Sequence, residues 1–362
     1  MVIHLIAAAR PNFMKIAPLY HALGKEAWAH PVIVHTGQHY DLNMSDVFFR
    51  DFGLPEPDIH LNVGSGTHAE QTGKVMIAYE KVIMKEKPDL VIVVGDVNST
   101  AAATLAAVKL GVKVAHLEAG LRSFDRTMPE EINRLVTDAI ADILWTPSPD
   151  GDENLLKEGV SKDKIHRVGN IMIDSLVMMK DRIESETLFE SLNVSKGGFG
   201  LVTLHRPANV DHPENLKKIC EILLNIAAKL PIVFPVHPRT LKNLEKTKQM
   251  DSLQAEPNIM LMEPLSYVRF MNLVFNSKFL LTDSGGVQEE TTYLGIPCLT
   301  LRPNTERPVT ITQGTNSLCT TDDVEMMADE IVSGKYKKGT VPELWDGQTA
   351  ARIVKNIVAM FH

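Results

Sequence analysis

The sequence predicts an α/β fold with two Rossmann-like domains, each built on a parallel sheet. Short apolar runs alternate with longer helical patterns along the whole chain, which is typical of βαβ units. Several of these runs are apolar at nearly every position, as strands buried on both faces should be. At 362 residues the chain is too long for one ordinary core and about right for two domains.

The predicted strands form two series with the same rhythm. In the first half they cover residues 3–8, 32–35, 90–94, 112–116 and 143–146. In the second half they cover residues 201–204, 232–234, 259–262, 279–281 and 297–300. Between residues 171 and 200 a charged helical stretch leads into Ser195-Lys196-Gly197-Gly198, which has the composition of a linker. We therefore expect domains over residues 1–172 and 173–348, followed by an amphipathic helix over residues 349–362.

The composition excludes several kinds of partner. A formal net charge of −8 argues against a nucleic acid or an anionic membrane surface, since both need a basic face. Cys220, Cys298 and Cys319 are widely spaced and odd in number, so neither a disulfide framework nor a zinc site is expected. No apolar run reaches the length of a membrane span. We expect a cytoplasmic protein that acts on a small molecule.

Polar side chains follow the predicted strands at the positions where open α/β sheets bind ligands, beyond the carboxyl ends. In the first half these residues are Arg10, Lys15, Gln38, His39, Asp96 and Glu118, and in the second half they are His205, Arg206, His237, Arg239, Asp283 and Ser284. Together they predict carboxylates in the first domain and a cationic rim in the second.

The segment from Thr282 to Glu290 predicts a strand, a glycine turn and the start of a helix. Ser284, Gly285 and Gly286 would supply a hydroxyl and unhindered backbone N–H groups at the positive end of that helix. A phosphate or pyrophosphate fits such a turn best. The alternative is an ordinary helix capped by Ser or Asp.

Each carboxylate of the first domain also has a purely structural alternative. Asp96 is placed to cap the helix that begins near Ser99. Glu118 ends a strand and has no local role of this kind, so it needs a partner or a function. Glu130 and Glu131 lie in the first turn of a helix, where acidic residues complement the helix dipole, and Glu130 is spaced to pair with Arg134.

Other motifs exclude common cofactors. The first strand-to-helix turn contains no glycine, and no G-x-x-x-x-G-K-[ST] occurs, which argues against NAD-dependent redox chemistry and P-loop hydrolysis. The histidines show no metal-ligand spacing, so no metal is expected. Arg302 and Arg307 flank Glu306 in a loop, where the alternative to ligand binding is a weak surface ion pair.

Taken in order, these segments resemble the non-hydrolysing UDP-N-acetylglucosamine 2-epimerase family over nearly the whole chain. The segments that carry the resemblance are ARPNFMKIAPL (9–19), TGQH (36–39), VVGDVNST (93–100), HLEAGLRS (116–123), MPEEINR (128–134), LHRPANVD (204–211), VHPRT (236–240), TDSGGVQEE (282–290) and NTERPVT (304–310).

The resemblance implies a GT-B architecture, in which two Rossmann-like domains surround a deep cleft and the final helix joins the first domain. It also implies a homodimer that needs neither a metal nor a nicotinamide cofactor. Its catalytic residues would be Asp96, Glu118, Glu130 and His205, supported by Lys15 and Arg134. Its substrate-binding residues would be Arg10, Phe270 near the uracil, Ser284, Gly285, Gly286, Glu290 on the ribose, and Arg307.

Three departures from the family pattern stand out. Ala8-Ala9-Arg10-Pro11-Asn12 replaces the usual Gly-Thr-Arg-Pro-Glu, and Ala208 replaces an acidic residue. Some bacterial members are activated by a second UDP-GlcNAc through an Arg-Gln-Met segment, which Tyr40-Asp41-Leu42-Asn43 does not reproduce. The sequence therefore leaves open whether a second UDP-GlcNAc activates this protein.

The function that the resemblance implies is interconversion of UDP-GlcNAc and UDP-ManNAc, by elimination of UDP to 2-acetamidoglucal and its re-addition. Four alternatives remain from the sequence. They are an epimerase of a related UDP-2,3-diacetamido sugar acid, a hydrolysing 2-epimerase, a GT-B glycosyltransferase and a catalytically silent UDP-sugar sensor.

Overall fold

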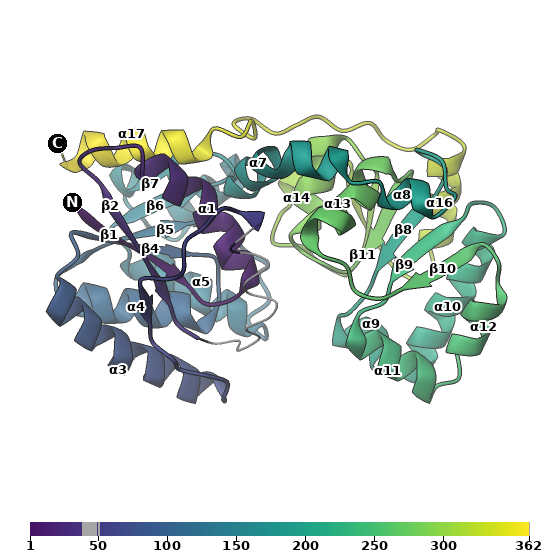
Figure 1. Cartoon of the computed structure of the whole chain (residues 1–362), viewed down its shortest axis with the longest axis horizontal. Coiled ribbons are helices and arrows are strands. Elements are labelled where there is room, and N and C mark those ends of the chain that lie inside the picture. Colours follow the sequence, from purple (N-terminus) through teal and green to yellow (C-terminus); the bar gives the residue numbers. More distant parts are fainter. Residues whose placement is uncertain (38–48, 50, 362) are drawn as a thin grey trace. The chain divides into compact units, whose positions relative to one another are not determined.

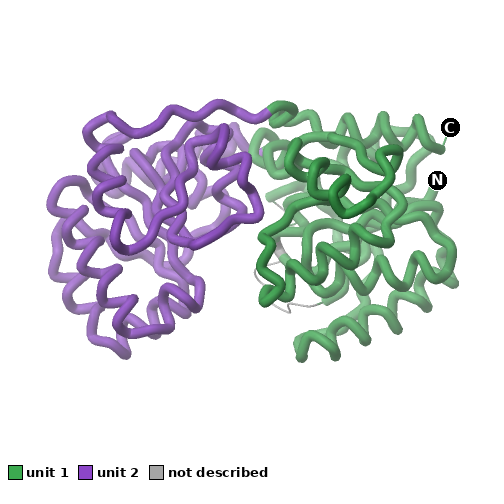
Figure 2. The backbone as a smooth tube through the Cα atoms, turned by 180° about the vertical axis from the view of Figure 1, so that it is seen from behind, with its two compact units in different colours: residues 1–178, 343–362 green, residues 179–342 purple. Residues whose placement is uncertain are grey.

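The computed structural model describes residues 1–37, 49 and 51–361, and of Arg10 only the backbone. The chain forms two compact units, coloured separately in Figure 2: unit 1 comprises residues 1–178 and 343–362, and unit 2 comprises residues 179–342. The chain leaves unit 1 within helix α7 (Ile171–Ser185) and returns to it after Pro342.

Unit 1 contains a parallel sheet with the strand order β3-β2-β1-β4-β5-β6-β7 (Figure 1). Its strands are β1 (Val2–Ala7), β2 (His30–His35), β3 (Ile59–His60), β4 (Leu90–Val94), β5 (Lys113–Leu117), β6 (Ile143–Thr146) and β7 (Ile165–Arg167). Its helices are α1 (Arg10–Leu23), α3 (His68–Glu86), α4 (Asn98–Lys109), α5 (Pro129–Ile140), α6 (Pro149–Lys157), the 3₁₀ turn η1 (Lys162–Lys164), the first part of α7, and α17 (Thr349–Phe361).

Unit 2 repeats this plan with the strand order β10-β9-β8-β11-β12-β13, again all parallel. Its strands are β8 (Gly200–Thr203), β9 (Ile232–Pro235), β10 (Ile259–Met262), β11 (Phe279–Thr282), β12 (Cys298–Leu301) and β13 (Asn316–Cys319). Its helices are α8 (Leu188–Ser191), α9 (Pro207–Val210), α10 (Pro213–Ala227), α11 (Pro238–Lys246), α12 (Met250–Ala255), α13 (Tyr267–Asn276), α14 (Val287–Leu294), α15 (Val309–Thr312) and α16 (Val324–Val332).

The central strands are apolar because helices cover both faces of each sheet. Every residue of β4 is buried, and β11 is buried throughout. Each fully buried Val, Leu or Ile side chain contributes about 1.5–3 kcal/mol of transfer free energy. This burial explains why continuous apolar runs, rather than alternating ones, predicted these strands.

All ten predicted strands are present, and none of their bounds shifts by more than two residues. The described residues also form β3, β7 and β13, which the sequence did not predict. All three lie at sheet edges, where short strands need less apolar sequence. Two Rossmann-like units with parallel sheets, the components of the predicted GT-B architecture, are thus confirmed.

The strand order places a ligand-binding crevice in each unit. In unit 1 the order reverses between β1 and β4, and in unit 2 it reverses between β8 and β11. Ligands of doubly wound sheets bind beyond the carboxyl ends of strands at such a switch point. Asp96 follows β4, His205 follows β8, and Asp283 follows β11, so the structure places these residues at the two switch points.

The terminal helix α17 belongs to unit 1, where it packs against α1. Asp174 of α7 accepts hydrogen bonds from the backbone N–H groups of Thr349 and Ala350, at 3.0 and 2.8 Å. These bonds satisfy the first N–H groups of α17, which have no partner within the helix. The returning segment is therefore fastened to unit 1 at the start of its helix.

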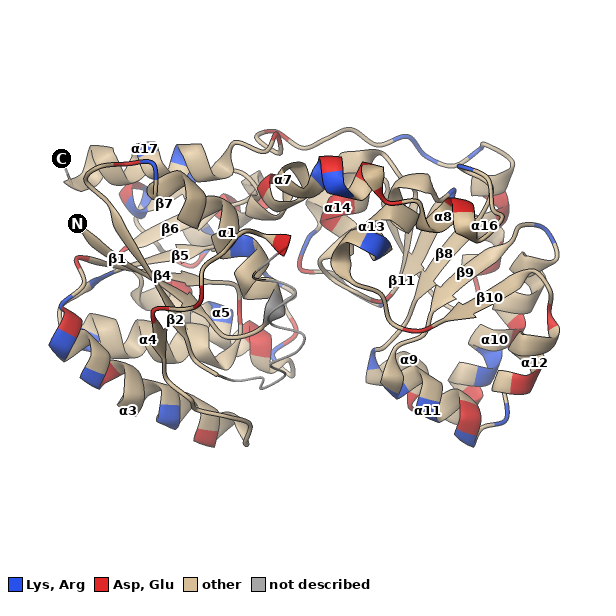
Figure 3. Cartoon of the chain, in the orientation of Figure 1, with Lys and Arg blue, Asp and Glu red and all other residues tan. Residues whose placement is uncertain are grey.

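Charged side chains of both signs alternate along outer helices such as α3 and α11 (Figure 3). Among the helices that the structure describes, none is both long and apolar enough to span a lipid bilayer.

Candidate functional site

The site in unit 1 centres on a buried ion pair between Lys15 and Glu118. Lys15 lies on α1, one turn after Arg10, and Glu118 directly follows β5. Lys15 Nζ lies 2.5 Å from Glu118 Oε2, and only 4% of the Glu118 side chain is exposed. The other carboxylate oxygen, Oε1, is buried and has no hydrogen-bond partner in the described structure. The sequence indicated that Glu118 needs a partner or a function, and this geometry leaves one oxygen available for chemistry.

Glu118 is held in a strained backbone conformation. Its φ of 73° lies in the left-handed region, which costs a non-glycine residue about 1–3 kcal/mol. Gly120 follows with a φ of 79°, and a Cβ atom there would lie 2.3 Å from the carbonyl oxygen of Gly151. The turn after β5 therefore needs glycine at position 120, and it fixes the direction of the Glu118 side chain.

Asp96 is the second carboxylate of unit 1. Its Oδ2 accepts a hydrogen bond from Nη1 of Arg134, which is buried on α5. About a third of the Asp96 side chain is exposed, so its carboxylate is accessible as well as paired. The helix-cap alternative for Asp96 is wrong, because Val97 occupies the N-cap position of α4.

Gly95, which precedes Asp96, lies beside the Lys15–Glu118 pair. A Cβ atom built at Gly95 would lie 3.3 Å from Lys15 Nζ and 3.9 Å from Glu118 Oε2. A side chain at position 95 would therefore press against this pair.

Arg134 also binds Glu131, not the neighbouring Glu130. Arg134 Nη2 lies 2.6 Å from Glu131 Oε2, and Glu131 further accepts hydrogen bonds from the backbone N–H groups of Ser123 and Phe124. Burial raises the pKa of Glu131, but these donors outweigh burial and lower it overall. Arg134 therefore pairs with Glu131 and not, as the spacing predicts, with Glu130. Glu130 itself is exposed in the first turn of α5.

In unit 2, Asp283 organises the residues that follow β8. It is fully buried and accepts hydrogen bonds from the backbone N–H groups of His205 and Arg206 and from Asn209 Nδ2. Nδ1 of His205 lies 3.1 Å from Oδ1 of Asp283. Burial raises the pKa of Asp283, but His205, Asn209 and Arg206 lower it overall. This carboxylate therefore orients His205.

The turn at Ser284, Gly285 and Gly286 leads into α14, as predicted. The backbone approaches two charged side chains closely here, because a Cβ atom at Gly285 would lie 2.8 Å from Glu306 Oε1 and 3.1 Å from Arg307 Nη1. A side chain at position 285 would therefore displace these charged groups, whereas nothing lies within 4 Å of a Cβ atom at Gly286.

Four charged side chains form a buried network beside this turn. Glu306 bridges Arg302 and Arg307 at 3.1 and 2.6 Å, and Arg307 lies 3.0 Å from Glu289. All four residues are at most 9% exposed, so the surface-pair alternative is wrong. Nη1 of Arg302 is buried without a hydrogen-bond partner in the described structure, which makes it a further donor near the turn.

Glu290 lies on α14 and accepts a hydrogen bond of 2.7 Å from the hydroxyl of Tyr267. Burial raises its pKa to about 7, and the Tyr267 hydrogen bond offsets this rise only in part. A carboxyl group at this position can accept a hydrogen bond from a ligand hydroxyl once it loses its proton.

A cavity of about 200 Å³ opens beside the turn. It is lined by His205, His237, Leu265, Phe270, Ser284 and Val287, among others. The ring centroids of His205 and His237 are 5.5 Å apart, and burial followed by the charges of His205 and Arg239 lowers the pKa of His237. An apolar pocket with an aromatic ring and a few polar groups suits a planar base with an attached anion.

Two of the expected contributions lie outside the described residues. The backbone of Arg10 begins α1, but its side chain is not described, and neither are Gln38, His39 and the segment 40–43.

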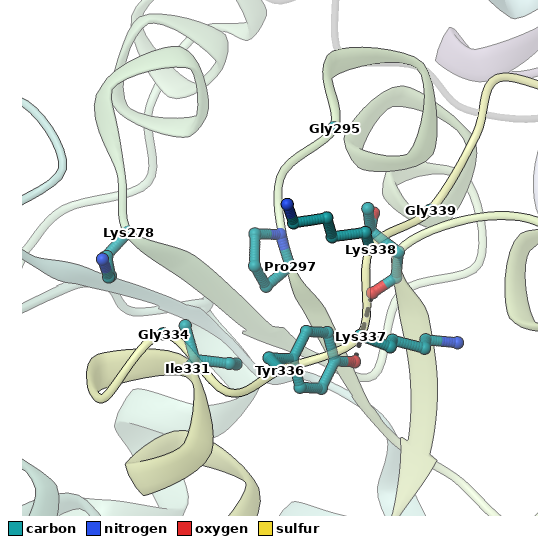
Figure 4. A pocket seen from close by; sticks show the side chains of 10 residues that line it. Lys278, Gly295, Pro297, Ile331, Gly334, Tyr336, Lys337, Lys338 and Gly339 are labelled. Atoms are coloured by element: carbon teal, nitrogen blue, oxygen red, sulfur yellow. Dashed lines mark hydrogen bonds between the residues drawn. The ribbon is translucent and has the colours of Figure 1, made fainter.

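A second cavity in unit 2, of about 380 Å³, contains none of the predicted residues (Figure 4). It lies beside the amino ends of β11, β12 and β13, next to Lys278, Pro297 and Thr315. This is the edge of the sheet opposite the switch point. In the described part of the chain, no group of three or more His, Cys, Asp or Glu side chains is arranged to hold a metal ion.

Comparison with known proteins shows similarity over the full length. The family model of the UDP-N-acetylglucosamine 2-epimerases matches residues 21–358. UDP-N-acetylglucosamine 2-epimerase of Methanocaldococcus jannaschii is 43% identical, covering 98% of each chain. The crystal structure of the M. jannaschii enzyme in complex with UDP-GlcNAc and UDP superposes with a TM-score of 0.87 at 42% identity, covering 99% of this chain and 100% of that one.

An enzyme named for another substrate reaches the same identity over a shorter part of the chain. UDP-2,3-diacetamido-2,3-dideoxy-D-glucuronate 2-epimerase of Pseudomonas aeruginosa is 43% identical over 88% of each chain. A lipopolysaccharide outer core galactosyltransferase shares the fold alone, with a TM-score of 0.59 at 16% identity over the full length of both chains. From the extent and identity of these matches, the chain belongs to the UDP-N-acetylglucosamine 2-epimerase family.

Proposed function

We propose that this protein is a UDP-GlcNAc 2-epimerase, which interconverts UDP-GlcNAc and UDP-ManNAc by eliminating UDP and adding it back. One observation carries the proposal. Unit 1 presents the carboxylates of Asp96 and Glu118, each held by a cation, and unit 2 presents a glycine turn beside a pocket lined by Phe270. A nucleotide-linked sugar needs both kinds of group.

The chemistry explains why carboxylates and an anion site must act on one substrate. The C2 proton of the sugar has no adjacent carbonyl to acidify it, so the C1–O bond breaks first and its electron pair leaves with UDP. Loss of the C2 proton then forms the C1–C2 double bond of 2-acetamidoglucal. Addition of a proton to the opposite face of C2 and of UDP to C1 completes the inversion. The sequence of steps is redox-neutral, so it requires no nicotinamide cofactor, and no step in it calls for a metal.

In unit 2 we assign the nucleotide contacts. Phe270 would pack near the uracil, and Glu290 would accept a hydrogen bond from a ribose hydroxyl. Ser284, Gly285 and Gly286 would donate to the diphosphate, together with Arg10, Arg307 and His205. Preorganised donors of this kind stabilise the charge that develops on a leaving group, and Asp283 supports the assignment because it fixes His205 in place.

In unit 1 we assign proton transfer at C2 to Asp96, Glu118 and Glu130. Inversion needs an acid or base on each face of the ring, which one carboxylate cannot supply. Lys15 and Arg134 would hold Glu118 and Asp96 in place through the ion pairs described above. Exposure of Glu130 is compatible with direct contact to substrate.

The oligomeric state and the cellular location of the enzyme are also part of the proposal. We infer a homodimer, supported by exposed apolar side chains on two helices that line one cavity of unit 1. These side chains are Ile77 and Met84 on α3 and Ile132 and Val136 on α5. A cytoplasmic location is supported by Cys220, Cys298 and Cys319, which are free, buried thiols.

A second candidate substrate is a UDP-2,3-diacetamido sugar acid. The observation that favours it is the 43% identity to the P. aeruginosa enzyme, which equals the identity to the M. jannaschii enzyme. Both reactions use the same elimination at C1 and C2, so the two candidates differ only in the substituents at C3 and C6.

The deciding experiment incubates the protein with UDP-GlcNAc alone and follows the products by NMR. We expect UDP-ManNAc at an equilibrium ratio, without free sugar. Free ManNAc would identify a hydrolysing enzyme, and no change would refute the proposal. Turnover of only the diacetamido sugar acid would select the second candidate. In D2O, the Asp96→Asn variant should lose both epimerisation and deuterium incorporation at C2, and unaltered incorporation would remove Asp96 from proton transfer.

A further inference from the structure

A buried carboxylate on α5, Asp138, contacts the chain on both sides of Glu118. Asp138 is 2% exposed. Its Oδ1 lies 2.6 Å from Nδ1 of His116, two residues before Glu118. Its Oδ2 accepts the backbone N–H of Gly120 at 3.0 Å, two residues after Glu118, and lies 2.7 Å from Nη1 of Arg122. The Asp138 side chain therefore bonds residues on both sides of Glu118, the residue with the strained backbone.

The same network reaches the second carboxylate of the site. Nε2 of His116 lies 2.9 Å from the carbonyl oxygen of Gly95, which precedes Asp96. The Gly95 N–H in turn donates to the carbonyl oxygen of Leu117 at 3.2 Å. His116 therefore links Asp138 to the turn that carries Asp96.

The hydrogen-bond partners fix the orientation of the His116 ring. A carbonyl oxygen only accepts, so Nε2 of His116 donates to Gly95, while Nδ1 faces Asp138. Burial raises the pKa of Asp138, but His116 and Arg122 lower it overall. Arg122 is balanced in turn by Glu158, which it binds through Nε and Nη2 at 2.8 and 2.7 Å.

Both oxygens of Asp138 thus have partners, which are His116 on one side and Gly120 and Arg122 on the other. A fully bonded buried network holds its members in one arrangement, whereas removing one member leaves its partners unsatisfied. Because Glu118 has an unfavourable φ, its conformation persists only where the surrounding contacts impose it. Asp138 provides such contacts at residues 116, 120 and 122.

We propose that Asp138 is a positioning residue, which holds Glu118 through the residues on either side of it and Asp96 through His116 in the arrangement that epimerisation requires. The proposal rests on the proposed function, since it assumes that these two carboxylates move protons at C2. Asp138 itself is enclosed by protein and does not touch the substrate.

The first test is Asp138→Asn, which keeps the shape but removes the charge. We expect kcat for UDP-GlcNAc to fall on the order of 10- to 100-fold, because misplacement of a reacting group by about 1 Å can cost 100-fold. KM for UDP-GlcNAc and Kd for UDP should stay within about twofold of the wild type, because the proposed UDP contacts on unit 2 are untouched. A kcat within about twofold of the wild type in the folded variant would overturn the proposal.

Asp152→Asn is the matched control. Asp152 is a partly buried carboxylate of the same unit that pairs with Arg167 at 2.6 Å, and it does not bond residues 116, 120 or 122. We expect it to lower Tm by a similar amount without changing kcat. Equal losses of kcat in both variants would show that Asp138 acts only through general stability.

His116→Asn tests the link to Asp96 without removing Asp138, and it keeps the proposal testable if Asp138→Asn fails to fold. It should also lower kcat, and the double variant should lose little more than either single variant, because the two side chains act as one unit. Additive losses would contradict this.

The outcomes separate the two proposals. Wild-type protein that leaves all UDP-sugars unchanged refutes the proposed function. Active wild type with fully active Asp138→Asn and His116→Asn variants refutes only the positioning role.

Discussion

Lys15 Nζ and Glu118 Oε2 lie 2.5 Å apart although 103 residues separate them in the chain. Helix α1 follows the first strand of the sheet and Glu118 follows the fifth, so only the folded sheet joins them. Lys15 is 8% exposed and Glu118 is 4% exposed, which places both charges away from bulk water. Their pairing underlies the first prediction.

Replacing Lys15 by Met should leave a buried carboxylate without its cation. We expect the free energy of unfolding to fall by about 3–5 kcal/mol, as for other broken buried pairs. Epimerisation should fall at least 100-fold, since Glu118 is no longer held. Urea unfolding and NMR assays measure the two effects. Lys113→Met, which breaks the more exposed pair with Asp142, should cost no more than about 1 kcal/mol. Similar losses in both variants would contradict the special role of the buried pair.

Replacing Gly285 by Ala should disturb the anion turn through space alone. The new Cβ atom would lie 2.8 Å from Glu306 Oε1 and 3.1 Å from Arg307 Nη1, so these side chains must move. We expect the affinity for UDP, measured by calorimetry, to fall about tenfold or more. Gly286→Ala should leave Tm unchanged, because nothing lies within 4 Å of its Cβ position. Unchanged UDP binding by Gly285→Ala would argue against this turn as the phosphate site.

The raised pKa of Glu290 predicts that UDP binding releases a proton. Burial raises this pKa to about 7, so the carboxyl is largely protonated below pH 7, whereas accepting a ribose hydroxyl favours the ionised form. The affinity for UDP should therefore increase from pH 6 to pH 7 and level off at higher pH. Calorimetry in buffers with different ionisation enthalpies measures the released proton, and Glu290→Gln should abolish the release.

The Glu290 carboxyl should make the free protein less stable as the pH rises, whereas it should make UDP binding tighter. Its pKa is higher in the folded than in the unfolded protein, so its contribution to the free energy of unfolding is full below pH 4.5. That contribution is lost as the pH rises from about 4.5 through about 7. In the absence of UDP, Tm should therefore depend less on pH over this range in Glu290→Gln than in the wild type.

The adjacent residues Glu130 and Glu131 should separate stability from catalysis. Glu131 is 1% exposed and bonds Arg134, Ser123 and Phe124, so Glu131→Gln should lower the free energy of unfolding by about 3 kcal/mol. Glu130 is exposed, so Glu130→Gln should keep the wild-type Tm and, under the proposed role, lose most of its kcat. Full activity of Glu130→Gln would remove it from the catalytic set. A wild-type Tm for Glu131→Gln would contradict its structural role.

Some properties were determined by the sequence alone. The ten predicted strands, the fold class and the family are readable because most of these strands are continuously apolar, as burial on both faces requires, and because functional residues follow them at fixed positions. The turn at Ser284, Gly285 and Gly286 is equally local, since a strand, two glycines and a helix start specify it without distant contacts.

Other properties were decided only by the tertiary structure. Local spacing allowed Arg134 to pair with Glu130. In the fold, Arg134 instead forms ion pairs with Glu131 and Asp96. The edge strands β3, β7 and β13 were missed because sheet pairing, not apolar sequence, defines them. Asp138 reads as an ordinary helix residue until the fold places it beside His116 and Gly120. The physical reason is the same in each case. Periodicity records which face of an element is buried, whereas the partner of a buried charge depends on where distant elements meet.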